Sequence, residues 1–273
     1  MGGMFHKAML LVLLAAVPTS AHAGWISEWT NTAFKSNGDR VNTEQLSMSI
    51  AGGHMRTDQS DVISVADYNT GRFTLMSPQR KFFWTGTIDE YVHEVARSRA
   101  EGMSQALAQA GEKAAAAKGK EKEYVPPKVD PAKLPPVSIT KTGLTDKIAG
   151  YDTVKYEARV NGELFQEIWV APSLNVSSDL DLDRFLDFQR KMSAGMMGKS
   201  ASSYNALYLS DDYRKLLQNA FVLKAVTHHS AGSFERTATS VRQAGVAASQ
   251  FQVPDAYRRV KLADVLAPPP QGS

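Results

Sequence analysis

The sequence predicts an α+β fold in which helices partly cover an antiparallel sheet. Two observations favour the sheet: apolar and polar side chains alternate along several stretches, and turn-forming pairs such as Asn161-Gly162 connect these stretches. A third observation favours the helices, because apolar side chains recur every three or four positions in residues 87–118 and 179–218. The chain of 273 residues is long enough to bury a sizeable core.

The first 23 residues have the three parts of a secretory signal peptide. Residues 1–7 are a short basic start, residues 8–17 are an apolar run, and a small-residue cleavage site ends at Ala23. The apolar run is too short to span a bilayer. We therefore expect residues 1–23 to be removed on export to the periplasm.

Composition limits the remaining function classes. The chain has no cysteine, so a mature protein that starts at Gly24 is not lipid-anchored through an N-terminal cysteine and carries no disulfide. The formal net charge of +3, with both signs mixed, argues against nucleic-acid binding. No later apolar stretch approaches the roughly 18 residues of a membrane helix. We expect a soluble protein with no nucleic-acid partner and no integral membrane span.

Residues 24–86 have the pattern of a meander of antiparallel strands. Leu46, Met48 and Ile50 alternate with polar residues, which is typical of a half-buried strand. Hairpin turns are predicted at Asn37-Gly38 and Gly52-Gly53. A further turn at residues 69–71 and three more strands are predicted, the strands at 62–68, 72–76 and 81–85.

The pattern changes to helical spacing over residues 87–118, where alanine becomes frequent. Residues 111–137 then mix lysine, glutamate and proline in a composition that buries little apolar surface. We interpret this stretch as an exposed insertion. It interrupts a single domain over residues 24–267, and residues 268–273 are expected to be a disordered tail.

The second half of the chain begins with the clearest hairpin, in which Asn161-Gly162 joins strands at 153–160 and 164–170. The acids Asp179, Asp181 and Asp183 suit the positive end of a helix dipole, so a helix is expected to begin near them. The remaining elements are a helix over 204–218, strands over 221–227 and 234–239, an extended segment over 251–260 and a short helix near Leu262.

Two motif matches fail on their chemistry. Ser138 and Lys141 match the S-x-x-K of serine acyl-transferases, and Lys141 also starts a K-T-G, but in those enzymes the two motifs are separate elements. The spacing of the three aspartates opens a calcium loop, but Arg184 and Arg190 stand where such a loop needs glycine and glutamate. Neither match predicts a site.

Metal binding and enzyme chemistry also lack support. His228 and His229 are neighbours, and adjacent strand residues point to opposite faces, so they are poorly placed to chelate one ion. Met192, Met196 and Met197 could bind copper, but methionines at helical spacing more often fill apolar space. No nucleophile elbow, zinc helix or phosphate loop is present. We predict a non-enzyme without a cofactor or metal.

Several short segments resemble one family of proteins. They are, in chain order, Gly53-His54-Met55-Arg56, residues 67–72, Ile148-Ala149-Gly150-Tyr151 with the following 154–160, residues 167–171 and residues 251–257. On these segments the chain resembles the superfamily of periplasmic half-barrel proteins that includes the Lol lipoprotein carriers. The resemblance implies a curved antiparallel sheet, or half-barrel, partly covered by helices, whose apolar concave side can shelter acyl chains.

The resemblance leads to a hypothesis about the site. A cavity on the concave side would be lined by apolar side chains from the strands and from the helical cover over residues 179–218. The side chains that we expect to line it are Leu46, Met48, Ile50, Tyr156, Ile168 and Met192. The leading hypothesis is a periplasmic protein that binds a lipid, an acylated protein or another apolar ligand there. In the alternative, the same side chains form a filled core, and the protein is an envelope interaction factor that binds a protein partner and no ligand.

Overall fold

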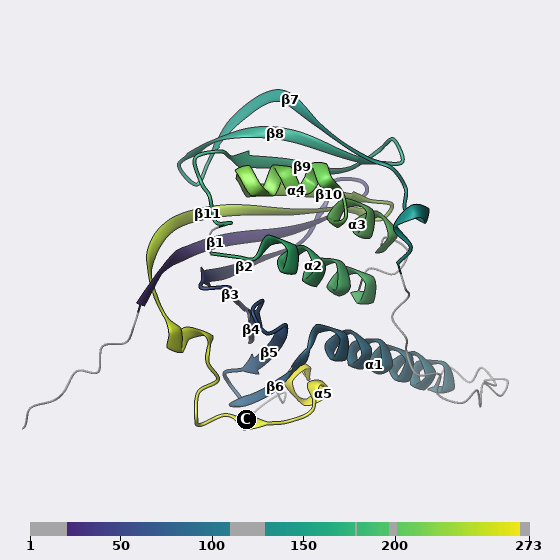
Figure 1. The fold of residues 1–273 in the computed structure, drawn as a ribbon. Helices are drawn as coiled ribbons and strands as arrows, with labels where there is room; N and C mark the ends of the chain where they lie inside the picture. The colour runs from purple at the N-terminus through teal and green to yellow at the C-terminus, as the bar shows by residue number, and fades with distance from the viewer. Residues whose placement is uncertain (1–20, 110–128, 178, 197–200, 268–273) are drawn as a thin grey trace, which may run out of the picture.

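The computed structural model describes residues 21–109, 129–177, 179–196 and 201–267 (Figure 1). The predicted signal peptide lies outside these residues except for its last three, which begin the first strand. Most of the predicted insertion also lies outside. Its described end, from residue 129, contains the 3-10 helix Pro131–Lys133 and leads into a strand at Val137.

One curved sheet of twelve strands dominates the described part of the chain. The strands are β1 (Ala21–Lys35), β2 (Arg40–Ala51), β3 (His54–Gln59), β4 (Val62–Asp67), β5 (Arg72–Ser77), β6 (Phe82–Thr87), β7 (Val137–Ile148), β8 (Tyr151–Val160), β9 (Glu163–Ala171), β10 (Phe221–His229), β11 (Gly232–Ala247) and β12 (Arg258–Arg259). Their order is β12-β6-β5-β4-β3-β2-β1-β11-β10-β9-β8-β7, and the two end strands do not pair with each other. The sheet is therefore open, as a half-barrel requires.

The prediction of an antiparallel sheet is correct for every neighbouring pair of the described strands except β12 and β6, which run parallel. After β11 the chain continues through a 3-10 helix (Ala248–Phe251) and returns along the far edge of the sheet. There the amide of Arg258 donates to the carbonyl of Lys81, and the amide of Val260 donates to the carbonyl of Phe83. The extended segment predicted over 251–260 thus ends as a short edge strand.

Two glycine-containing turns explain the long β7–β8–β9 meander. Asn161 and Gly162 both have positive φ, 53° and 82°, as the tight turn between β8 and β9 requires. Ala149 and Gly150 form the corresponding turn between β7 and β8, with φ of 51° and 87°. The sequence interpretation did not include β7, and it made β11, predicted over 234–239, too short.

Five α-helices lie in the described residues: α1 (Ile88–Gln109), α2 (Leu182–Met196), α3 (Ala201–Tyr208), α4 (Asp211–Asn219) and α5 (Leu262–Leu266). α1 begins with a reciprocal cap, in which the Thr87 amide donates to the Glu90 carboxylate and the Glu90 amide donates to the Thr87 hydroxyl. The single helix predicted over 204–218 is wrong. Ser210 breaks it, because its hydroxyl accepts from the amide of Tyr213 and caps a new helix, α4.

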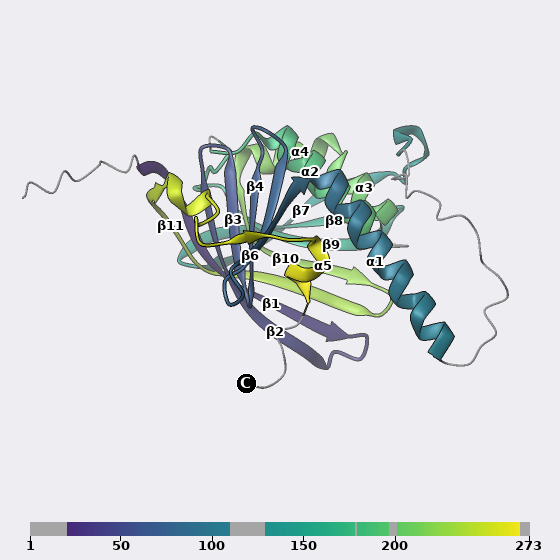
Figure 2. The same cartoon turned by 90° about the horizontal axis from the view of Figure 1, so that it is seen from below.

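Helices lie on the inner side of the curved sheet (Figures 1 and 2). α4 lies under β8 and β9, and α1 lies near β5 and β6 and against α2. Residues paired directly across strands share a side, and Trp25, Trp29, Leu46, Met48 and Ile50 are buried on one such side.

The described core residues form three clusters that fill much of this side. One is centred on β1, β2 and β11, a second on β5, β6 and α1, and a third on β8, β9 and helices α2 to α4. The half-barrel is thus largely filled by its own side chains.

Candidate functional site

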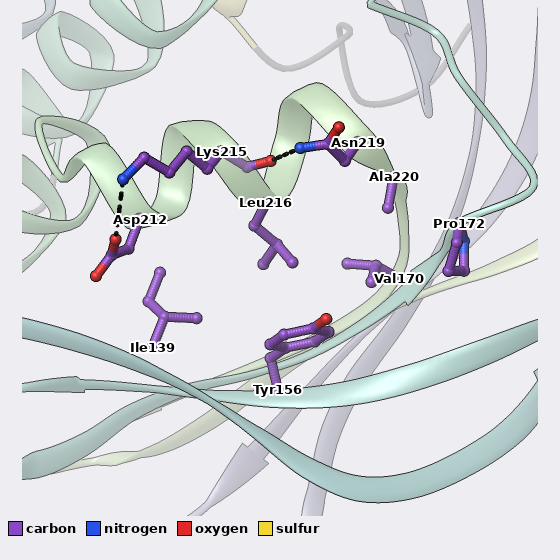
Figure 3. A pocket seen from close by; sticks show the side chains of 9 residues that line it. All are labelled: Ile139, Tyr156, Val170, Pro172, Asp212, Lys215, Leu216, Asn219 and Ala220. Atoms are coloured by element: carbon purple, nitrogen blue, oxygen red, sulfur yellow. Dashed lines mark hydrogen bonds and ion pairs between the residues drawn. The ribbon is translucent and has the colours of Figure 1, made fainter.

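A pocket of about 430 Å³ opens between α4 and the last three strands of the sheet (Figure 3). Ile139 of β7 and Tyr156 of β8 rise from the sheet, and Leu216 reaches down from α4. The other lining residues are Val170, Pro172, Asp212, Lys215, Asn219 and Ala220. The site therefore combines an apolar floor with a polar rim supplied by the outer face of α4.

Polar side chains of the rim are held by contacts within α4. Lys215 Nζ lies 3.7 Å from Asp212 Oδ1, and Asn219 Nδ2 donates to the carbonyl oxygen of Lys215 at 2.7 Å. Both ionic groups of the pair are largely exposed, so the pair itself adds little stability. It leaves one cation and one anion at the mouth of an apolar pocket, an arrangement suited to an amphiphilic molecule.

α4 is anchored beside the pocket by aromatic packing. Tyr213 is buried within the third core cluster, and burial raises the pKa of its hydroxyl far above the ordinary value. Its ring lies 5.9 Å from that of Tyr208 at the end of α3. Because these tyrosines stay neutral, their packing contributes apolar contacts to the anchoring of α4.

The six side chains expected to line a cavity lie in different places. Tyr156 lines the pocket. Leu46, Met48 and Ile50 are buried in the first core cluster, and Ile168 is fully buried in the third. Met192 of α2 is half-buried against the second cluster.

Sequence reasoning missed most of the pocket. Tyr213, Leu216, Leu217 and Ala220 follow helical spacing, and this pattern indicated a buried helix face but not the open space beside it. Ile139 belongs to the strand that was not predicted.

Each aspartate of the series near α2 has a partner within the protein. Asp181 caps α2, since its carboxylate accepts from the amide of Arg184 at 3.1 Å. Asp179 accepts from the Trp25 indole at 2.9 Å, and Asp183 pairs with Arg214. Across the described residues, no group of three or more histidine, cysteine, aspartate or glutamate side chains is placed to hold a metal ion.

His228 has a protein partner on the outer side of the sheet. Its Nε2 lies 2.9 Å from Glu167 Oε1, and Lys155 pairs with the same carboxylate, whereas His229 is exposed. Burial raises the pKa of Glu167, but the hydrogen bonds from Lys155 and His228 outweigh burial and hold this pKa below its ordinary value. The site is a surface ion cluster, packed beside Trp169.

None of the helices in the described residues is long and apolar enough to cross a membrane.

Comparisons with known proteins give fold-level likenesses. No protein-family model and no curated protein sequence matches the chain. Similar solved structures include the Pseudomonas aeruginosa MucA/MucB complex, at 11% identity and a TM-score of 0.37, over 90% of this chain and 60% of that one. PNGF-II is similar at 12% identity and a TM-score of 0.36, over 87% of this chain and 31% of that one.

A third similar structure is a Vibrio parahaemolyticus domain described as an outer membrane lipoprotein-sorting protein domain. It is 9% identical, with a TM-score of 0.27, and the match covers 84% of this chain and 88% of that one. A domain of the kind that the sequence segments resemble is thus among the structural neighbours. The chain spans about a third of PNGF-II and three fifths of the MucB chain, and with TM-scores below 0.5 none of these structures assigns it an activity.

Proposed function

We propose that the protein is a non-enzymatic periplasmic binding protein whose ligand is a lipid, an acylated protein or another molecule with an apolar part. The pocket between α4 and β7–β9 is the proposed binding site. Its volume of about 430 Å³ is the observation that carries the proposal, because ligand pockets usually measure about 300–1,000 Å³.

The lining supports an amphiphile as the ligand. Ile139, Tyr156 and Leu216 provide apolar surface that a hydrocarbon chain can cover, which releases water from both. Asp212 and Lys215 stand at the rim and keep their solvent contact, so a polar head group can remain beside them in water. A ligand placed in this way needs no buried charge.

Native mass spectrometry of the purified protein, before and after organic extraction, tests the proposal. A reproducible added mass that extraction removes is expected, and the extracted protein should take up lauric acid. Leu216→Trp places a larger ring in the pocket and should reduce this uptake by at least about tenfold. Leu266→Trp is the matched control, because Leu266 is 44% exposed on α5 and does not line the pocket.

A second candidate is the envelope interaction factor with a filled core. It is favoured by one observation: Leu46, Met48, Ile50 and Ile168, expected to line a cavity, are packed at 0–7% exposure. Clean protein without an added mass, together with no lauric acid uptake by the wild type, would reject the binding-protein proposal and favour this candidate.

A further inference from the structure

A group of five cations lies at the edge of the sheet where β12 pairs with β6. They come from the turn before β6 and from the segment that continues through β12 into α5 (Figures 1 and 2). In strand order this edge is the opposite end of the sheet from β7–β9, where the α4 pocket lies. The five cations, called the edge patch below, are Arg80, Lys81, Arg258, Arg259 and Lys261, and all except Arg80 are exposed.

Backbone and side-chain hydrogen bonds hold the two segments together. The amide of Arg258 donates to the carbonyl of Lys81 at 2.8 Å. Arg80 connects the turn to α5, because its guanidinium donates to the carbonyl oxygen of Val265. Cations that are about 180 residues apart in the sequence are therefore fixed at one place in the fold.

Two of the guanidinium groups lie over one aromatic ring. The Cζ of Arg258 is 4.9 Å from the centre of the Phe82 ring, and the Cζ of Arg80 is 5.9 Å from it. The face of the ring attracts both cations but does not neutralise them. Since like charges repel each other, this arrangement favours an anion beside the two arginines.

The hydrogen bonds that the edge patch donates go to neutral acceptors. Arg80 Nε donates to the Ser77 hydroxyl at 3.2 Å, and Arg259 Nη2 donates to the carbonyl of Thr85 at 3.0 Å. Within the ranges of the chain that the structure describes, none of the five cations forms an ion pair with a carboxylate. Their positive charge is therefore left for an external partner.

Nearby acids do not balance this charge. Residues 77–83 and 251–267 contain five cations but only two acids, Asp255 and Asp264. Asp61, on the neighbouring turn, accepts a hydrogen bond from the Gln79 amide at 2.7 Å. The two segments thus carry an excess of three positive charges, as large as the formal net charge of +3 of the whole chain.

An exposed leucine lies beside the cations. Leu266 of α5 is 44% exposed and follows Val265, whose carbonyl accepts from Arg80. Leu262 and Val265 are buried in the second core cluster and hold α5 against the sheet. An apolar side chain next to lysines and arginines is typical of surfaces that lie on a membrane.

We propose that the edge patch docks the protein on the surface of a bilayer that contains anionic phospholipids, with Leu266 at the contact. Arg258 is paired with Phe82 and Arg259 with Phe83, so the two arginines lie on opposite sides of the sheet and its edge is the docking surface. Lipids move laterally, so separate head groups can meet cations that point in different directions. The anionic surface attracts each nearby lysine or arginine, and the apolar interior accepts the leucine.

Co-sedimentation of the mature protein with vesicles tests the proposal. Vesicles of phosphatidylglycerol and phosphatidylethanolamine supply an anionic surface, and phosphatidylcholine vesicles supply a neutral one. The test variant is Arg258→Gln with Arg259→Gln. The matched control is Lys35→Gln with Arg40→Gln, which removes two exposed cations from the β1–β2 hairpin, four strands away from β12.

The wild type and the control are expected to bind the anionic vesicles, less so as salt is raised, and not the neutral ones. The test variant should bind at least about tenfold more weakly. Leu216→Trp should bind as the wild type does, since the α4 pocket is a separate site. No binding by the wild type, equal binding by the test variant, or equal binding to neutral vesicles would overturn the proposal. Binding of poly-glutamate without binding of vesicles would also overturn it, and would assign the edge patch to an acidic protein partner.

Tryptophan fluorescence gives a check that needs no loss of charge. The emission of Leu266→Trp should move to shorter wavelength when anionic vesicles are added, because the new ring leaves water. Leu209→Trp is the control, since Leu209 is 46% exposed in the turn between α3 and α4 and does not belong to the edge patch. The four native tryptophans are present in both variants. No shift for Leu266→Trp, or the same shift for both variants, would refute the proposed contact.

Discussion

Replacing Leu207 with alanine tests whether α3 is a packed cover of the sheet. Leu207 is 0% exposed and packs in the cluster that contains Ile168, Leu186 and Tyr213. If α3 is firmly packed, the variant loses the buried side-chain carbons and leaves a cavity that the cluster fills only in part.

The expected cost follows from this burial. Leucine-to-alanine changes at fully buried sites destabilise proteins by about 2–5 kcal/mol, so we expect about 3 kcal/mol for Leu207→Ala. For a domain of this size, such a loss lowers the melting temperature by roughly 6–12 °C. Leu209→Ala is the matched control, since Leu209 lies two residues further on and is 46% exposed. Its cost should stay below about 1 kcal/mol.

Urea unfolding followed by circular dichroism measures both variants. The midpoint of Leu207→Ala should fall while the slope stays the same, because the unfolded surface is unchanged. A loss below about 1 kcal/mol would refute the reasoning, since α3 would then be loosely attached and the concave side would be open to ligands.

Three further predictions concern the caps, turns and charges of the fold. Asp181→Ala removes the cap of α2 and should lower the free energy of unfolding, measured in urea, by about 1 kcal/mol. The control Asp187→Ala changes an exposed residue of the same helix and should lower it by no more than about 0.5 kcal/mol. An equal effect of the two variants would contradict the assigned cap. Gly232→Ala should destabilise far more than Gly38→Ala. Both glycines have positive φ, but a Cβ at Gly232 would overlap the carbonyl oxygen of Phe34, whereas one at Gly38 meets open space; similar losses would show that β1 and β11 can separate there. The pKa of Glu167 is lower in the folded protein than in the unfolded chain, where it is near 4.5. Its ionised carboxylate therefore stabilises the fold fully above the unfolded pKa, and this stabilisation is lost as pH falls through the folded pKa. The stability difference between wild type and Glu167→Gln should therefore shrink between pH 6 and pH 3, and a difference independent of pH would disprove the contribution of the ion cluster.

Local signals predicted those elements whose geometry depends on a few neighbouring residues. The Asn161-Gly162 turn is an example, because its two positive φ values are accessible to asparagine and glycine at little cost. β7 was missed because its sequence carries no such local signal. It is an edge strand with a bulge between Lys141 and Thr145, and most of its residues are exposed, so its sequence lacks a regular apolar alternation.

The candidate pocket depends on contacts between distant segments. Ile139, Tyr156 and Leu216 come from three separate elements, and no local pattern indicates that they surround one pocket.

Packing energy determines where a ligand can enter this half-barrel. Leu46, Met48, Ile50 and Ile168 are each at most 7% exposed, and returning one such side chain to water costs about 1.5–3 kcal/mol. Exposing all four to make an interior cavity would cost on the order of 6–12 kcal/mol, comparable to the whole stability of a typical domain. A ligand that entered there would have to repay this cost by its own burial. The α4 pocket requires no such opening, so binding should begin there before any core side chain is displaced.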